Sequence, residues 1–318
     1  MPARGRFREQ PFHAWLRRSI ARGRGVRVGI GDDAAVLRPR GRSLLATADG
    51  LVEGVHFERG TAPRLAGAKA AGRVLSDLAA MAGVPRFGLL SIVVPRRWTA
   101  ASVRAFVAGF DARLRRFGAC LVGGDAACAE GPFVAAAALL GEPGPGRPWL
   151  RSGARAGDLI LATGSFGGSI LGRHLRFRPR VREAIALARR LPIRAAIDVS
   201  DGLALDLHRL CQASRVGAVL DAGSVPISRA AFALARRTGR SPLAHALGDG
   251  EDHELILAMA RSGRGALARL PRRFRLRVPL RVIGRFGGKG VRLRDRRGRE
   301  RPLPRSGWEH GMGGDRSR

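Results

Sequence analysis

The chain has 318 residues, 45% of them hydrophobic and 5% aromatic, which is enough for two domains that each bury an aliphatic core. No apolar run approaches the roughly 18 residues of a membrane-spanning helix, and the arginine-rich N-terminus lacks the apolar stretch of a secretory signal. The net charge of +33 does not by itself indicate a nucleic-acid ligand, because arginine is spread over the whole chain with no aromatic side chains interleaved.

Strands alternate with helices in the first half. Apolar runs at residues 26–30 and 44–47 predict strands that stop at acidic turns, the first at Asp32 and Asp33 and the second at Asp49. Helical spacing of apolar residues predicts two amphipathic helices, over residues 65–82 and 101–117. Further strands are predicted at residues 87–94, at 121–122 (breaking at Gly123, Gly124 and Asp125) and at 133–140.

A Gly- and Pro-rich stretch, residues 141–151, predicts a domain boundary, so we divide the chain into residues 1–145 and 146–318. The second part alternates in the same way and ends in a basic tail from about residue 294, which is expected to be partly mobile. The overall class is therefore α/β or α+β. The predicted elements of the second part are strands at 158–162, 195–199, 216–220, 254–259 and 280–283, and helices at 180–190, 203–214 and 230–237.

The three cysteines, Cys120, Cys128 and Cys211, form no recognisable framework. Their odd number and irregular spacing predict neither a set of disulfides nor a zinc site. This favours a reducing, cytoplasmic location.

Only 25 residues are acidic, and many of them lie beside Gly or Ser where apolar runs end. Carboxylates gathered in one place repel one another unless a hard cation such as Mg²⁺ binds them, and the lack of a His/Cys cluster argues against zinc. This pattern is typical of phosphoryl transfer from a nucleotide, although no Walker A motif is present and residues 164–169 are only a weak candidate for a phosphate cradle. The acids concerned are Asp32, Asp33, Asp49, Asp77, Asp125, Asp198, Asp201, Glu251 and Asp252.

Seven short motifs together resemble thiamine-monophosphate kinase, of the aminoimidazole ribonucleotide synthetase superfamily. The resemblance covers roughly residues 26–308, and its specificity comes from the order of the set. In chain order the motifs are GIGDDAAVL (29–37), ADGLVEGVHF (48–57), LSDLAAMAGVP (75–85), GGDA (123–126), RSGARAGD (151–158), IDVSDGLALDL (197–207) and GEDHEL (250–255).

The resemblance implies a homodimer whose N-terminal domains pair their sheets and bind ATP and Mg²⁺, while the C-terminal domain closes over the site. The implied reaction is direct in-line transfer of the γ-phosphate of ATP to thiamine monophosphate. It gives thiamine diphosphate in the last step of that cofactor's biosynthesis. Several Mg²⁺ ions per site are implied, with K⁺ left open, and neither a specific nucleic acid nor a membrane is an expected partner.

The resemblance also implies roles for individual residues. Metal-binding roles carry over to Asp33, Thr47, Asp49, Asp77, Asp125, Asp198 and Asp201. ATP contacts carry over to Asp33, Gly124, Asp125 and Ser200. The positions near thiamine monophosphate are His56, Arg151, Glu251 and Trp308, of which an arginine suits a phosphate and a tryptophan can stack on a cationic thiazolium.

Some positions depart from the family pattern. Ala48, Val74, Ala126 and Ala127 stand where the family usually has Thr or Asn, so hydrogen bonds worth about 0.5–1.5 kcal/mol each are missing if the family makes them. Two enzyme alternatives remain: a selenophosphate synthetase and a hydrogenase-maturation enzyme. The first is disfavoured because it normally has a reactive cysteine or selenocysteine in a Gly-rich N-terminal segment, whereas the first cysteine here is Cys120. A non-catalytic, arginine-rich nucleic-acid-binding protein is the alternative from another class, and it leaves the ordered aspartates unexplained.

Overall fold

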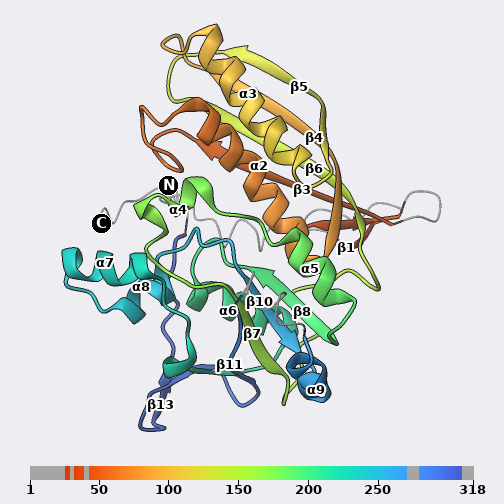
Figure 1. Cartoon of the computed structure of the whole chain (residues 1–318), viewed down its shortest axis with the longest axis vertical. Coiled ribbons are helices and arrows are strands. Elements are labelled where there is room, and N and C mark those ends of the chain that lie inside the picture. The colour runs from red at the N-terminus through yellow and green to blue at the C-terminus, as the bar shows by residue number, and fades with distance from the viewer. Residues whose placement is uncertain (1–25, 29–31, 39–42, 271–278, 310–318) are drawn as a thin grey trace, which may run out of the picture.

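The computed structural model describes residues 26–28, 32–38, 43–270 and 279–309. The predicted basic N-terminus, the glycines of the first acidic motif and the end of the predicted tail lie outside these residues. The described chain forms two sheets with helices against them, which places it in the predicted α/β (α+β) class (Figure 1). Within the described ranges, no helix has both the length and the apolar character needed to cross a membrane.

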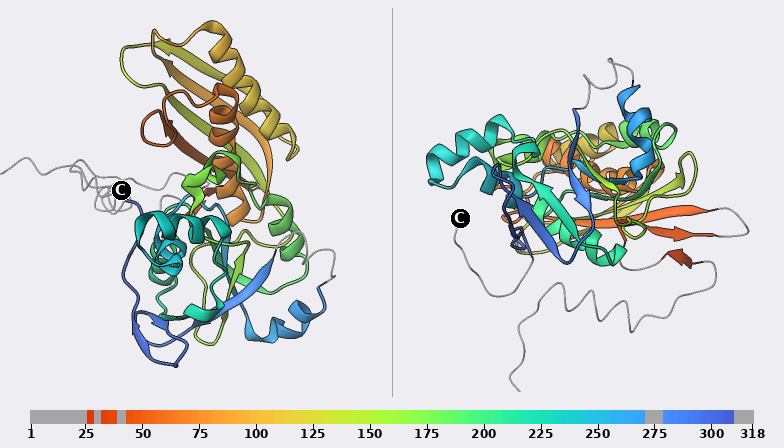
Figure 2. Two further views of the ribbon diagram at one scale, coloured as in Figure 1. Left: turned by 60° about the vertical axis from the view of Figure 1, so that its left-hand side comes forward. Right: turned by 90° about the horizontal axis from the view of Figure 1, so that it is seen from below.

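The first sheet has six strands, in the order β1-β2-β3-β6-β4-β5, and only β4 and β5 run parallel. Two helices, α2 (Pro63–Ala80) and α3 (Ala100–Arg115), pack on each other and cover one face of this sheet (Figure 2). The opposite face carries exposed apolar side chains. The strands are β1 (Val26–Val28), β2 (Ala35–Leu37), β3 (Leu44–Val52), β4 (Gly83–Val94), β5 (Cys120–Cys128) and β6 (Val134–Pro143).

Two strands run through acidic residues that the sequence placed in turns, so those two turn predictions are wrong. β3 continues past Asp49 because Asp49 pairs with Ala137 of the long alanine-rich strand β6. β5 likewise continues through Asp125, which pairs with Ser91 of β4. Gly124 permits this pairing, since a Cβ there would lie 1.9 Å from the carbonyl oxygen of Leu90.

The second sheet has seven strands, in the order β13-β12-β9-β11-β7-β10-β8. Its central strands are buried on both faces: Leu159 and Leu161 of β7 join the core of the first half, whereas Ile160 belongs to a separate core beneath the sheet. The strands are β7 (Leu159–Thr163), β8 (Ile193–Asp198), β9 (Ala218–Asp221), β10 (Leu255–Met259), β11 (Leu280–Phe286), β12 (Val291–Arg294) and β13 (Glu300–Pro302). The helices are α4 (Arg173–Arg176), α5 (Val181–Ala188), α6 (Leu203–Ser214), α7 (Arg229–Thr238), α8 (Pro242–Gly248) and α9 (Arg264–Ala268).

Helix α2 lies at the junction of the two halves. It contacts β3, β4 and β6 on one side, and β8, α4 and α5 of the second half on the other (Figure 1). Its polar residues Lys69, Arg73 and Asp77 are spaced four apart, so they share one face of the helix. That face carries charged groups into the space between the two halves, where the candidate site lies.

Candidate active site

Three carboxylates from distant parts of the chain meet beside α2. Asp33 follows β1, Asp77 lies near the end of α2, and Asp198 ends β8. One oxygen of each lies within 4.8 Å of the others, a spacing that a single metal ion can bridge. The sequence resemblance implied a metal-binding role for all three residues.

Two hydroxyl groups orient this acidic cluster (Asp33, Asp77 and Asp198). Thr47 Oγ1 of β3 donates to Asp77 Oδ2 at 2.6 Å. Ser76 Oγ, from the residue before Asp77, donates to Asp198 Oδ2 at 2.6 Å and so links α2 to β8. Each hydroxyl thus engages one oxygen of one carboxylate.

Arg151 holds the third carboxylate from outside the cluster. Its Nε and Nη2 donate to the two oxygens of Asp33 at 2.9 and 3.0 Å, and its backbone N–H donates to Asp32. We expected Arg151 near thiamine monophosphate. That role stays a prediction: Arg151 pairs with Asp33, and it is not one of the described residues that line the adjoining pocket.

Burial and mutual repulsion make the cluster hard to ionise. Burial raises the pKa of Asp33 to about 6, against the lowering effect of Arg151. Burial, with Asp198 and Asp49 nearby, raises the pKa of Asp77 well above its ordinary value, and burial also raises that of Asp198. A hard divalent cation removes this penalty, and an all-oxygen donor set of three carboxylates fits Mg²⁺.

We predict that Mg²⁺ raises the melting temperature more at about pH 8 than at about pH 5. Burial raises the pKa of Asp33 from its ordinary 3.8 to about 6, so the metal-free protein loses stability as pH rises through that window. Metal binding needs the deprotonated carboxylates and relieves their repulsion, so its gain grows over the same range. Thermal melts with and without Mg²⁺ at both pH values measure this, and an equal shift at the two would contradict it.

Asp49 and Asp201 flank the cluster as ion pairs. Arg73 donates to both oxygens of Asp49, at 2.6 and 2.8 Å, and although burial raises the pKa of Asp49, Arg73 holds it below its ordinary value. Asp201 pairs with Arg209, which also contacts Asp206 at 2.7 Å. Metal-binding roles for Asp49 and Asp201 remain predictions, and they would require these arginines to share the carboxylates with the cation.

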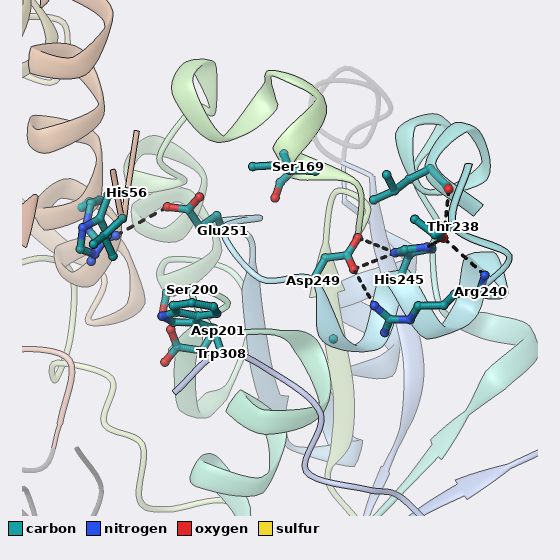
Figure 3. A pocket seen from close by; sticks show the side chains of 15 residues that line it. His56, Ser169, Ser200, Asp201, Thr238, Arg240, His245, Asp249, Glu251 and Trp308 are labelled. Atoms are coloured by element: carbon teal, nitrogen blue, oxygen red, sulfur yellow. Dashed lines mark hydrogen bonds and ion pairs between the residues drawn. The ribbon is translucent and has the colours of Figure 1, made fainter. Parts of the chain in front are cut away.

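Figure 3 shows a pocket of about 370 Å³, whose lining includes Arg73, the partner of Asp49. His56, Glu251 and Trp308, three of the four residues expected near thiamine monophosphate, line it together. Trp308 lies over Ser200 and Asp201 in Figure 3, and its backbone N–H donates to the carbonyl of Asp201 at 2.9 Å. The pocket thus has a charged end beside α2 and an aromatic wall from the C-terminal segment.

Gly124 and Asp125 do not join this group. They are exposed on β5, the edge strand of the first sheet, whereas Asp49 is on β3. Three strand spacings separate β3 from β5, which amounts to about 14 Å across the sheet. Within one subunit, this spacing is far longer than the few ångströms over which Asp125 and Asp49 could share one metal ion.

Sequence reasoning missed His253. Its ring is buried, stacks on Phe177 at 3.8 Å, and places Nδ1 3.6 Å from Asp198 Oδ2. Neither ring nitrogen has a hydrogen-bond partner among the described residues. Burial, with Arg73 nearby, lowers the pKa of His253 to about 3, so a neutral imidazole faces the acidic cluster. Its place inside the motif GEDHEL was the available signal.

The Gly-rich turn at residues 164–169 is not an open phosphate cradle. The N–H of Gly167 donates to both oxygens of Asp252 at 3.0 Å, and the N–H of Gly168 donates to Asp249 at 2.7 Å. Carboxylates of the chain itself therefore occupy the donors that a phosphate would need. The turn packs the second half and offers these two amides to no ligand.

Comparison with known proteins places this geometry in a family. Residues 31–142 match the family described as AIR synthase related protein, N-terminal domain, and residues 154–294 match its C-terminal domain. A thiamine-monophosphate kinase of Rhodopirellula baltica is 41% identical over 263 residues, 79% of this chain and 82% of the relative. The chain belongs to the thiamine-monophosphate kinase family. A second thiamine-monophosphate kinase, from Synechococcus elongatus, is 35% identical over 84% of this chain and 87% of that relative.

Solved structures agree with this thiamine-monophosphate kinase assignment. The enzyme of Stenotrophomonas maltophilia is 32% identical with a TM-score of 0.70, over 91% of this chain and 98% of that one. AaThiL complexed with AMPPCP and TMP is 26% identical with a TM-score of 0.81, over 95% of this chain and 97% of that one. The hydrogenase maturation protein HypE of E. coli is 20% identical with a TM-score of 0.68, over 82% of this chain and 87% of that one, and shares the fold alone.

Proposed function

We propose that this protein phosphorylates thiamine monophosphate to thiamine diphosphate with ATP and Mg²⁺. The observation that carries the proposal is the acidic cluster beside a pocket lined by His56, Glu251 and Trp308, in a chain 41% identical to a thiamine-monophosphate kinase. A terminal phosphate oxygen of the substrate forms a bond to the γ-phosphorus of ATP as the bond to the bridging oxygen of ADP breaks. No phosphorylated protein side chain is involved.

Each group of residues has a distinct task in this reaction. Asp33, Asp77 and Asp198 would hold Mg²⁺, which when bound neutralises negative charge on the transferring phosphate. The pocket holds the thiazolium and pyrimidine rings, and its charged end beside α2 directs the substrate phosphate to the cluster. Fixing the two phosphates in line is the main contribution that the protein makes to such a transfer.

The direct test incubates purified protein with ATP, thiamine monophosphate, Mg²⁺ and K⁺ and measures thiamine diphosphate by chromatography. We expect product to form only when all of the first three are present. Folded protein that forms no thiamine diphosphate would refute the proposed function. Binding to nucleic acid with a steep salt dependence and no turnover would support the arginine-rich binder instead.

We further propose that the protein works as a homodimer in the cytoplasm. The face of the first sheet that α2 and α3 leave uncovered carries Phe87, Leu89 and Val122, which are 48%, 41% and 55% exposed. Apolar side chains grouped on a sheet face favour contact with a second copy. Free cysteines, including the exposed Cys128, suit a reducing compartment.

Trp308 offers a test of the substrate pocket. We predict that Trp308→Ala raises the KM for thiamine monophosphate about tenfold through loss of a cation–π contact, while Trp308→Phe retains most of the affinity. The side chain is 42% exposed, so the melting temperature should change little. Steady-state kinetics measure the effect, and Phe232→Ala, at a side chain 48% exposed and outside the pocket, is the control. A KM unchanged in Trp308→Ala would remove Trp308 from the substrate site.

A further inference from the structure

Lys69 is an unusual residue for this chain. The sequence has 58 Lys and Arg residues, yet only Lys69 and Lys289 are lysines. The Lys69 side chain is 0% exposed, although burying an ammonium group is costly unless it is paired. Among the described residues, the one fully buried basic side chain is a lysine, in a chain that uses arginine at nearly every other basic position, which points to a geometric requirement.

The partners of Lys69 explain that requirement. Its Nζ donates to the carbonyl oxygen of His56 at 2.5 Å and lies 2.5 Å from Glu251 Oε1. His56 comes from the loop between β3 and α2, whereas Glu251 comes from the segment before β10 in the second half. Both residues line the pocket, so one buried ammonium ties two of its walls together.

Glu251 needs such a tie because its backbone is strained. Its φ is 52°, in the left-handed region that non-glycine residues rarely adopt. Its N–H donates to the carbonyl of Ser200 at 2.5 Å, and Arg73 Nη1 lies 3.7 Å from the same Oε1 that Lys69 contacts. Oε1 is buried, and it contacts Lys69 as an ion pair that lacks hydrogen-bond geometry. The side chain as a whole is 26% exposed, so part of it remains accessible from the pocket.

We propose that Lys69 is a positioning residue for the acceptor substrate, which it serves by holding His56 and Glu251 at the separation that thiamine monophosphate requires. This inference rests on the proposed function. Lys69 does not line the pocket and acts only through its two partners. It fixes one oxygen of Glu251 and thereby aims the rest of the carboxylate at the cationic, hydrogen-bonding rings of the substrate.

The shape of the side chain explains why lysine is present. An ammonium is a compact point charge that contacts a carbonyl and a carboxylate at the same short distance. A guanidinium is wider and planar, and in a fully buried site it displaces one of the two walls. Lys69→Arg therefore keeps the charge and loses the geometry, whereas Lys69→Met keeps much of the shape and loses the charge.

The experiment compares Lys69→Arg and Lys69→Met with wild type in steady-state kinetics and in calorimetric binding of thiamine monophosphate without ATP. We expect both variants to raise the KM and the Kd for thiamine monophosphate about tenfold or more and to leave the KM for ATP within about twofold. Lys289→Arg, at the other lysine, which is exposed, should behave as wild type. A double-mutant cycle with Glu251→Gln should show effects that are not additive, because the two residues act as one unit.

Three results would overturn the inference. One is a Lys69→Arg or Lys69→Met variant with wild-type affinity for thiamine monophosphate. Another is a loss that appears only as a lower melting temperature, or equally in the KM values for ATP and for thiamine monophosphate, which would indicate a merely structural ion pair. If the Lys69 variants do not fold, Glu251→Gln alone provides the test. The third contradicting result would then be wild-type affinity of Glu251→Gln for thiamine monophosphate. If wild-type protein forms no thiamine diphosphate, the proposed function fails, whatever calorimetry shows for Lys69.

Discussion

Replacing Asp77 with asparagine is expected to lower kcat/KM for thiamine diphosphate formation by roughly 10³-fold while leaving the metal-free protein at least as stable as wild type. Burial, Asp198 and Asp49 raise the pKa of Asp77, so ionising it costs free energy in the folded state. Asparagine has nearly the same shape and can still accept the hydrogen bond from Thr47. The variant therefore removes a repulsive charge without opening a cavity.

Unchanged or higher stability together with a large loss of activity distinguishes a metal site from a cluster of structural carboxylates. Kinetics, thermal melts and Mg²⁺ titration on one preparation measure it, and the Mg²⁺-induced rise in melting temperature should shrink together with the rate. Asp111→Asn is the matched control, because Asp111 pairs with Arg115 on the surface of α3 and lies outside the site. A fully active Asp77→Asn enzyme would contradict a metal site at Asp77. A strongly destabilised variant would show that the carboxylate is structural.

The sequence predicted well those elements whose signals are local. Helix α2 spans Pro63–Ala80 against a predicted 65–82, because its stripe of apolar residues, including Leu75 and Leu78, is complete within the helix itself. The predicted ends of β3 and β5 were wrong because the length of each strand depends on its partner strand. Asp49 stays in β3 only because the alanines of β6 lie opposite. The sequence of one strand does not show which strand will pair with it.

The candidate site shows the same division. Asp33, Asp77 and Asp198 were foreseen because each sits in a recognisable motif, and the structure brings these three together. Lys69 was not foreseen, since a lone lysine on a helix reads as a solvated side chain until Glu251, far along the chain, is placed against it. Contacts between the two halves of the chain determine which charged side chains are buried. These contacts could not be predicted from the sequence.

The second prediction with a large expected effect on activity concerns Asp125. It lies level with Ser91, Ala136 and Gly50 across four neighbouring strands, about 14 Å from β3, and it is exposed beside the apolar face proposed for dimer contact. We predict that Asp125 serves the nucleotide of the partner subunit. Both Asp125→Ala and Asp77→Asn homodimers should then be nearly inactive, since each lacks one component of every site.

Heterodimers of these two variants should regain about half of the wild-type activity, because one of their two sites would combine an intact Asp77 with an intact Asp125. Co-expression with two affinity tags and tandem purification isolates the mixed species. A heterodimer of Asp77→Asn with Asp33→Asn is the control and should stay inactive, since both residues belong to one acidic cluster within a subunit. Inactive Asp125→Ala/Asp77→Asn heterodimers would place Asp125 in the site of its own subunit, and a monomer by light scattering would remove the dimer altogether. Restored activity, by contrast, would explain how a residue on the far edge strand can act in the same reaction as a cluster beside α2.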